Sequence, residues 1–515
     1  MRSRLAGARA GSLATFAALA AAAVLLDLGR LHALEHGDSI VPVLVSLQRW
    51  TPFYWDQERY GMLVPLVALP VRDPLWNLLL QRLLLVLAGL AAVVLLARHV
   101  LAGREWRVAG ALATVLVLLS WPAPWLFEYL GDQPYGLGLA LALAGLAVAE
   151  PGPGGRRGPA RLGAGLALVL LAHWVNAATG LLLVPLAVAR AGVDLADGEP
   201  RRAALDRLVV DGALLVAGLA AGQVLLRLYP VFSGQPLRLA TGALPVAEWP
   251  RAWAAYLGRA AREAGAIAAA TGAVAAAGAA ALLLPAVRPH ARAVLLRAGA
   301  LVAGAAVYAL LTGTFAWVRD NAWHWRYLAP AVLLVQLAAV APLAEALAAA
   351  GRLARAALPG AVALVPLAAL AAAGPPSLAR VRADLDRVAG RWTEDVLAAR
   401  CDLVTGDYWS VWPAVWHVAW SGRARGTPVR VYGLAHRANP TVPAWRDRPS
   451  STLRVCRVRG AEGAADRALR DYGLWPARVV ERRATVDVLV PAPGRAPGAA
   501  PAPGGGAATG SGSGT

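Results

Sequence analysis

The sequence has few charged residues for its length, and this scarcity limits what the protein can be. Only 16% of its 515 residues are charged, whereas 58% are hydrophobic. A soluble domain carries about 25% charged residues, so the polar surface here is too small to cover a particle surrounded by water. The mean hydropathy of +0.52 agrees with this. The composition therefore excludes a soluble protein.

Lysine is absent, and every basic side chain is an arginine. The formal net charge of +19 would suit a nucleic-acid partner if the arginines formed one stripe. They are instead scattered at the ends of apolar runs and through the C-terminal region. Positive charge beside membrane helices is explained by topology, so we expect no nucleic-acid binding.

The chain also lacks the short motifs of common soluble enzymes. It has no glycine-rich phosphate loop, no serine-centred elbow and no zinc-ligand spacing. We therefore assign no metal ligands, although metal dependence stays open. Only two cysteines occur, Cys401 and Cys456. A disulfide in an exported domain and a pair of buried thiols in neighbouring strands are both compatible with this pair.

Long apolar runs separated by short basic clusters fill the first three quarters of the chain. Several approach the roughly 20 residues that cross about 30 Å of hydrocarbon as a helix. The first run begins like a signal peptide, but it is too long and no A-x-A site ends it, so we expect a retained helix. The runs cover residues 11–28, 83–96, 108–120, 137–148, 208–226, 265–284, 298–316, 329–349 and 356–373.

The basic residues also predict the topology. Arg2, Arg4 and Arg9 should hold the N-terminus in the cytoplasm. If residues 162–190 form a hairpin of two short helices turning near Asn176, the later basic loops stay cytoplasmic as well. About eleven crossings of the plasma (inner) membrane then follow, and the C-terminal domain lies outside the cytoplasm.

The C-terminal quarter has a different pattern. Strand-like runs at 402–405, 429–434, 453–458 and 485–490 alternate with helical segments such as 464–472. We therefore predict an α-helical polytopic membrane domain over residues 1–374 and a small extracytoplasmic α/β domain over residues 375–493. A disordered tail rich in proline, glycine, alanine and serine follows over residues 494–515.

Acidic and aromatic residues gather in three loops that this topology places outside. A carboxylate near the outer membrane surface can act as a general base toward a hydroxyl, and the arginine fork matches two phosphate oxygens. Tryptophan and tyrosine offer flat faces to sugars, although both also gather at membrane interfaces without a ligand. The candidates are Glu35, Asp38, Asp56, Glu58, Arg59 and Tyr60 in the first loop, Glu128 and Asp132 in the second, and His324, Arg326 and Tyr327 in a late one.

The acidic first loop, followed by Trp55-Asp56-Gln57-Glu58-Arg59-Tyr60-Gly61 and an apolar stretch, resembles the GT-C glycosyltransferase superfamily. His173-Trp174-Val175-Asn176 is similar to the short paired helices of those enzymes. Two further segments that are similar to regions of GT-C-like proteins are Arg326-Tyr327-Leu328-Ala329-Pro330 and Gly406-Asp407-Tyr408-Trp409.

The resemblance implies a membrane enzyme that moves a sugar from a polyprenyl-phosphate carrier to a cell-envelope glycan or protein, with no cofactor besides the lipid-linked donor. It places the catalytic acid in the first outer loop, where Asp38 matches best. The superfamily often has two adjacent acids there, whereas this chain has Gly37-Asp38-Ser39. Glu35, Asp56 and Glu58 therefore remain candidates, and His173 and Asn176 are expected to bind substrate.

Two other functions are open. A transporter or flippase of lipid-linked glycans would carry polar residues on broken helices at mid-membrane, and this chain has few polar residues inside its apolar runs. A non-enzymatic scaffold, whose outer domain binds a partner, is also compatible with the sequence.

Overall fold

The structure is a computed structural model of the chain, and it divides into two compact units that are not contiguous in sequence. The first comprises Met1–Leu31 and Leu83–Pro376, and the second His32–Arg82 and Ser377–Thr515. The residues that the structure describes are 2–55, 61–101, 105–151, 157–233, 242–350, 360–426, 429–436 and 439–492. The C-terminal tail predicted over 494–515 lies outside them.

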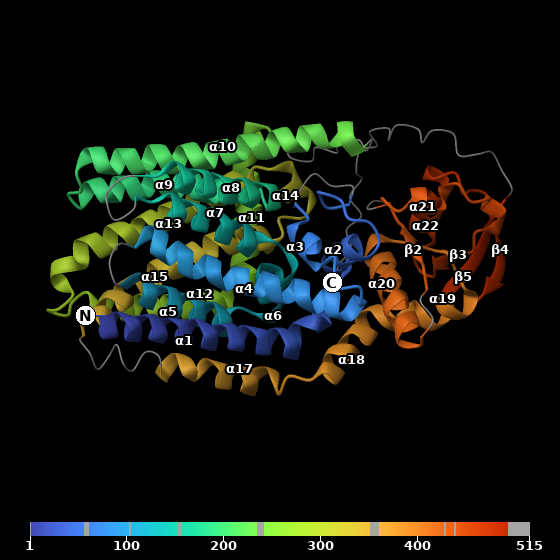
Figure 1. Cartoon of the computed structure of the whole chain (residues 1–515), viewed down its shortest axis with the longest axis horizontal. Coiled ribbons are helices and arrows are strands. Elements are labelled where there is room, and N and C mark those ends of the chain that lie inside the picture. The colour runs from blue at the N-terminus through green and yellow to red at the C-terminus, as the bar shows by residue number, and fades with distance from the viewer. Residues whose placement is uncertain are drawn as a thin grey trace. The chain divides into compact units, whose positions relative to one another are not determined.

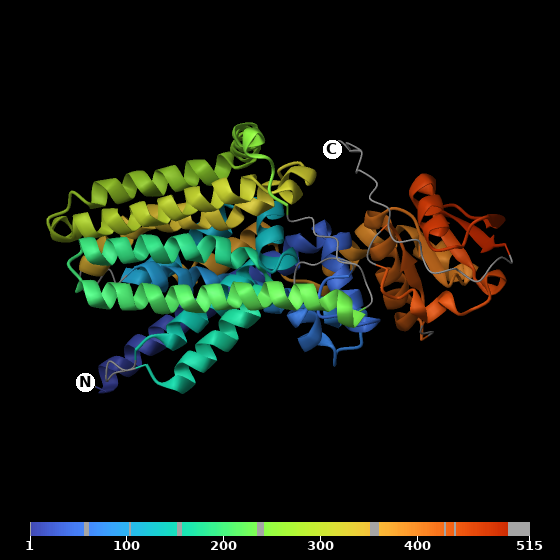
Figure 2. The same ribbon diagram turned by 90° about the horizontal axis from the view of Figure 1, so that it is seen from above.

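The first unit is helical, and Figures 1 and 2 show most of its helices running side by side. Its longer helices are α1 (Arg2–Leu26), α4 (Pro74–Val100, which begins in the second unit), α5 (Glu105–Ser120), α7 (Tyr135–Ala149), α8 (Pro159–Val175), α9 (Ala178–Ala196), α10 (Arg201–Ser233), α11 (Trp249–Glu263), α12 (Gly265–Ala281), α13 (Ala291–Gly313), α15 (Ala329–Ala349) and α17 (Val365–Ala373). Shorter turns are η1 (Asp27–Leu31), α6 (Ala123–Leu126), η3 (Phe127–Asp132), η4 (Val246–Glu248), η5 (Arg288–His290), α14 (Ala316–Asp320) and η6 (Trp325–Leu328).

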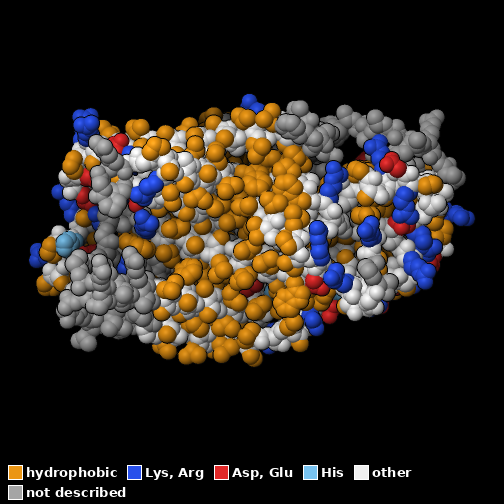
Figure 3. Space-filling view, viewed as in Figure 1, with side chains coloured by type: hydrophobic (Ala, Val, Ile, Leu, Met, Phe, Trp, Pro, Cys, Tyr) orange, Lys and Arg blue, Asp and Glu red, His pale blue; other side chains and the backbone are white. Residues whose placement is uncertain are grey.

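The outward surface of these helices is apolar. Leu119, Val209 and Val216 are each more than half exposed, and Figure 3 shows hydrophobic side chains spread over the helices, with charged ones gathered at the end that holds the N-terminus. Soluble monomers rarely expose contiguous apolar patches beyond a few hundred Å². This surface is that of a helical membrane protein, as the sequence predicts.

The predicted number of about eleven crossings is wrong. Among the described residues, six helices are long and apolar enough to cross a membrane, or up to eight if each of two bent helix pairs is one span. Helices α5, α7 and α8 have 16, 15 and 17 residues, which is short of the roughly 20 that a crossing needs. One bent pair joins α11 to α12 at an angle of 81°.

The break predicted near Asn176 is present, since α8 ends at Val175 and α9 begins at Ala178. Small residues then allow close packing: a Cβ atom on Gly145 of α7 would lie 2.7 Å from the Gly165 carbonyl oxygen of α8. Backbones that approach so closely gain van der Waals contact, which drives helix association where lipid replaces water.

The second unit combines the loop after the first helix with the C-terminal domain. Its loop part contains η2 (His32–Leu34), α2 (Gly37–Leu47), α3 (Leu63–Ala68) and the start of α4. Its C-terminal part contains α18 (Leu378–Ala389), η7 (Gly390–Trp392), α19 (Thr393–Ala399), β1 (Leu403–Thr405), α20 (Tyr408–Ala424), β2 (Tyr432–Leu434), α21 (Pro443–Arg446), η8 (Ser450–Thr452), β3 (Val455–Val458), α22 (Glu462–Asp471), β4 (Ala477–Arg482) and β5 (Val486–Pro491). No local pattern in the sequence indicates that residues 32–82 belong in one unit with the chain from Ser377 onward.

The five strands form one mixed sheet in the order β2-β1-β3-β5-β4. Strand β1 pairs in parallel with β2 and β3, whereas β5 pairs antiparallel with β3 and β4. One face is covered by a cluster that includes Trp445 and Leu469. On β2, Gly433 packs against Trp412 of α20, where a Cβ atom would lie 2.3 Å from the indole ring. Cys401, just before β1, and Cys456 on β3 form a disulfide with a Cα–Cα distance of 5.8 Å.

Candidate functional site

Glu35 is buried directly after the first helical segment, among residues that keep its carboxyl group ionised. The His32 ring Nδ1 lies 3.1 Å from Oε1 of Glu35, and Nε of Arg82 lies 3.6 Å from the same oxygen. Burial would raise the pKa of Glu35, but Arg82, His32 and Ser39 outweigh it and lower the pKa from 4.5 to about 2. A carboxylate that holds its charge so firmly is a weak base. Glu35 is therefore a poor candidate for the catalytic acid that the sequence left open.

Helix α2 begins at Gly37, two residues after Glu35, with His36 as its N-cap. The His36 ring accepts a hydrogen bond from the Asp38 backbone N–H at 3.2 Å, and Ser39 Oγ accepts one from the His36 N–H at 2.9 Å. This reciprocal capping box fixes the direction in which the helix starts. It places Asp38 in the first turn of α2.

Asp38 is 4% exposed and lies against two phenols. The Tyr408 hydroxyl donates to Oδ1 of Asp38 at 2.8 Å, and the Tyr54 hydroxyl lies 3.4 Å from the same atom. The two hydroxyl oxygens are 2.5 Å apart. We call Asp38, Tyr54 and Tyr408 the Asp38 cluster. Tyr408 thus gives the Asp38 carboxylate a neutral donor, whereas Glu35 contacts the Arg82 guanidinium.

The Asp38 cluster joins the first loop to the start of α20. Asp407 caps α20 by accepting from the backbone N–H groups of Trp409 and Ser410, which sets Tyr408 as its first helical residue. Gly37 then permits the approach, since a Cβ atom there would lie 2.7 Å from Cε1 of Tyr408. Tyr54 and Tyr408 were not among the predicted site residues. The Gly406–Trp409 motif marked the right segment but not its partner.

A second polar cluster lies within the first unit, at the start of α15. Nη1 of Arg326 is 3.9 Å from Oε2 of Glu128, and its Nη2 donates to the Tyr327 hydroxyl at 3.1 Å and to Oδ1 of Asn321 at 3.3 Å. The His324 ring accepts from the Arg326 backbone N–H at 3.3 Å. We call Glu128, Asn321, Arg326 and Tyr327 the Arg326 cluster. The structure thus brings together four of the predicted substrate-binding residues, Glu128, His324, Arg326 and Tyr327.

Aromatic stacking holds the two loops of the Arg326 cluster together. The Trp125 and Trp325 rings stack with centroids 4.3 Å apart and planes 13° from parallel. Asp132 ends the π-helical turn η3 and accepts a hydrogen bond from the neighbouring Gln133 side chain. Glu128 and Asp132 are both buried, so neither is the solvated loop acid that such positions often hold.

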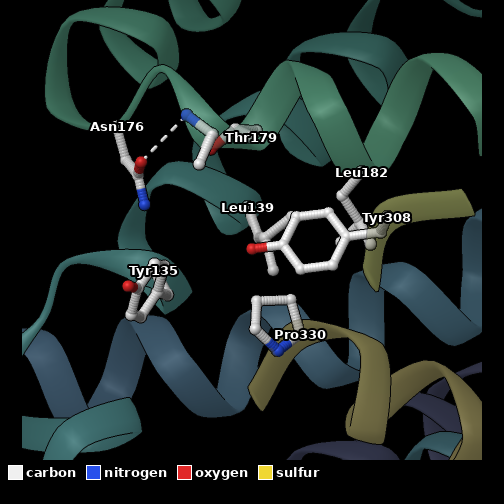
Figure 4. A pocket seen from close by; sticks show the side chains of 8 residues that line it. Tyr135, Leu139, Asn176, Thr179, Leu182, Tyr308 and Pro330 are labelled. Atoms are coloured by element: carbon white, nitrogen blue, oxygen red, sulfur yellow. Dashed lines mark hydrogen bonds between the residues drawn. The ribbon is translucent and has the colours of Figure 1, made fainter. Parts of the chain in front are cut away.

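His173 and Asn176 lie elsewhere in the first unit. His173 bonds the Val169 carbonyl oxygen through Nδ1 at 2.9 Å and packs against Gly218 of α10, which makes it a helix-packing residue. Asn176 accepts from the Ala178 N–H at 3.0 Å and lines a small cleft with Thr179 and Tyr308 (Figure 4). The Tyr308 ring projects into this cleft.

Four predicted residues, Asp56, Glu58, Arg59 and Tyr60, lie outside the described part of the chain. Arg82 was not among the predicted site residues. Its position within the apolar helix α4 was a usable signal, because an arginine among apolar residues of a membrane helix is costly without a partner. Compared with models of known protein families and with curated proteins, the chain matches none. The resemblance to GT-C glycosyltransferases therefore rests on its short motifs alone.

Proposed function

We propose that this protein is a membrane glycosyltransferase that moves a sugar from a polyprenyl-phosphate carrier to an extracytoplasmic acceptor, with Asp38 as general base. The observation that carries the proposal is the pair of first-loop carboxylates. Glu35 is held by Arg82 and His32, and Asp38 is oriented by the Tyr408 hydroxyl, which donates to its Oδ1 at 2.8 Å. A general base needs a carboxylate that is oriented toward the proton it takes.

The reaction that we propose is a direct displacement at the anomeric carbon. The Asp38 carboxylate takes the proton of the acceptor hydroxyl as that oxygen bonds to the anomeric carbon. The bond from this carbon to the phosphate oxygen breaks at the same time, and polyprenyl phosphate leaves with the electron pair. One displacement inverts the configuration of the sugar, and Tyr408 keeps Asp38 oriented throughout.

Arg326 is the residue that we propose for donor-phosphate recognition in the helical unit. Its guanidinium lies near Tyr327 and Asn321, and its ion pair with Glu128 is long at 3.9 Å. A phosphate can replace a distant carboxylate as partner because two of its oxygens match the planar fork. No metal is assigned a part in this scheme.

The disulfide supports an extracytoplasmic position for the C-terminal domain. Such bonds persist in oxidising compartments and are rare where thiols are kept reduced. We propose a plasma (inner) membrane protein with a cytoplasmic N-terminus and its catalytic loop outside, as the basic residues predict.

Transport of a lipid-linked glycan is the second candidate function. The break between α8 and α9 at Asn176, and the bend between α11 and α12, are discontinuities of the kind that transporters place at their binding sites. Movement of a labelled lipid-linked sugar across proteoliposomes, with no bond cleaved, would favour this function.

The test of the proposal uses the full-length protein in lipid nanodiscs. Polyprenyl-phosphate-linked hexoses and pentoses, labelled in the sugar, are supplied together with oligosaccharide acceptors, and free polyprenyl phosphate is measured. We expect release by the wild type, loss in Asp38→Asn, and normal release in Asp447→Asn, a change of the same kind at an exposed position. Absence of release from every donor would reject the enzyme and favour the scaffold.

A further inference from the structure

Trp409 differs from the other tryptophans of α20 that face the protein interior. Trp412 and Trp416 are fully buried, whereas Trp409, in the first turn, is 51% exposed. Exposing half of an indole gives up apolar burial worth on the order of 2 kcal/mol, which Trp412 and Trp416 of the same helix retain. A tryptophan that remains exposed in such a helix indicates a surface that binds a ligand.

The exposed ring is held in place beside the Asp38 cluster. Its centroid lies 5.1 Å from that of Tyr408 and 5.5 Å from that of His36, with both ring pairs close to perpendicular. Tyr408 donates directly to Asp38, and His36 accepts from the Asp38 backbone N–H. Trp409 is therefore one residue along the chain from the phenol that orients the carboxylate.

Sheet topology places the same segment where ligands bind in open α/β sheets. The chain passes from β1 through α20 to β2 on one side, and then returns to β3 on the other side of β1. Ligands of such sheets bind beyond the carboxyl ends of the strands, where the strand order reverses. Tyr408 and Trp409 follow β1 at this edge, and the exposed His436 follows β2, with its ring 6.0 Å from that of Tyr408.

From these observations, we propose that Trp409 is the platform on which the acceptor sugar rests. The ligand class is a carbohydrate ring: its C–H face packs on the indole, and its hydroxyl groups meet the polar atoms of His36 and His436. Aromatic rings with a few placed polar groups are the usual composition of small-ligand sites. This inference rests on the proposed function, because it assigns the acceptor of that reaction as a glycan.

The alternative role for an exposed tryptophan is membrane anchoring, and Trp76 provides a matched control. Trp76 belongs to the same unit, lies in the first turn of α4 and is 54% exposed. If Trp409 served only to anchor the protein in the headgroup region, alanine at either position would have the same effect, and neither would change sugar binding.

The experiment measures sugar binding separately from transfer. Saturation-transfer difference NMR on the full-length protein in nanodiscs is recorded with gluco-, manno-, galacto- and arabino-oligosaccharides. We expect at least one to bind, with affinity about tenfold weaker in Trp409→Ala and unchanged in Trp76→Ala, since loss of one ring contact worth about 1.4 kcal/mol is a tenfold change. Trp409→Phe, which retains an aromatic face, should recover most of the binding.

Asp38→Asn separates this inference from the proposed function. It should bind the oligosaccharide like the wild type while releasing no polyprenyl phosphate. Suppose that the wild type releases polyprenyl phosphate but Trp409→Ala binds every sugar as the wild type does. The sugar-binding role of Trp409 is then rejected, whereas the proposed glycosyltransferase function is retained. If no sugar of the panel binds the wild type, or Trp409→Ala and Trp76→Ala lower membrane association equally without changing sugar binding, the platform is rejected as well.

Discussion

The Asp38 cluster and the Arg326 cluster are both buried polar groups where a loop meets a helix, but they hold their charges differently. The Asp38 carboxylate accepts a 2.8 Å hydrogen bond from the Tyr408 phenol. In the other cluster, Oε2 of Glu128 lies 3.9 Å from Nη1 of Arg326. A phenol orients a carboxylate without carrying a charge itself, whereas a guanidinium presents a planar fork that matches two phosphate oxygens. The first arrangement suits proton transfer and the second suits phosphate binding.

Removing the charge from each cluster tests this comparison most strongly. Asp38→Asn should lower the rate of transfer by roughly 10²–10⁴-fold, the usual loss for a general base, while the protein still folds. Glu128→Gln should leave the rate within a few-fold, because no proton transfer is assigned to it. Rates of polyprenyl phosphate release at saturating donor measure both. Equal losses in the two variants would remove the distinction between the clusters.

The next largest effect is expected at Glu35, and it concerns stability. Glu35→Gln removes a buried carboxylate that lies 3.6 Å from the Arg82 guanidinium, which should cost about 3–5 kcal/mol of unfolding free energy. Because the pKa of Glu35 is lowered from 4.5 to about 2, the ion pair contributes fully above about pH 4.5. That contribution is lost as the pH falls toward about 2.

Thermal unfolding of the wild type and Glu35→Gln between pH 3 and pH 7 measures the Glu35 effect. The difference between the two should shrink as the pH is lowered. Exposed Glu394, which pairs with Arg425 on the surface, is the control, and Glu394→Gln should change stability little. A difference for Glu35→Gln that does not depend on pH would contradict the ion pair.

The disulfide is expected to contribute somewhat less. It closes a loop between positions 55 residues apart, and removing a native disulfide typically costs about 2–5 kcal/mol. Cys401→Ser with Cys456→Ser should lower the unfolding temperature of the second unit, and wild-type protein denatured without reductant should contain no thiol that alkylates. Two alkylated thiols would show that the bond is absent and weaken the case for an oxidising compartment.

The smallest effect is expected from Arg326→Lys. The charge remains, but the planar fork is lost, so the KM for the donor should rise about tenfold with little change in the maximal rate. Arg319→Lys, a similar change at a more exposed arginine, should leave the KM unchanged. If both variants behave alike, Arg326 does not recognise the donor.

The sequence predicted well those structural features that depend on residues close together in the chain. The predicted strands at 402–405, 453–458 and 485–490 correspond to β1, β3 and β5. Strand β4 was missed because its residues are mostly exposed and polar at an edge. Helix α20 was missed because it is apolar on almost every side, which removes the periodicity that reveals a helix.

The candidate site was predictable only in part, for a different reason. The acid at Asp38 follows from its position after the first helix, but its contact with Tyr408 joins residues 370 positions apart. No local pattern encodes such a pairing. The helix count failed because α5, α7 and α8 are short, so apolar runs in the sequence overestimated the number of full crossings.

The distance along the chain between Asp38 and Tyr408 has a consequence for how the protein is made. At about 5–20 residues per second, the ribosome reaches Tyr408 roughly 20–75 s after Asp38 has been synthesised. Throughout that interval the helices of the first unit are inserted while α2 has no α20 to pack on. A chain that ends before α20 therefore lacks the phenol that contacts Asp38, so that a ribosome stalled in the membrane part yields a protein without the Asp38 cluster.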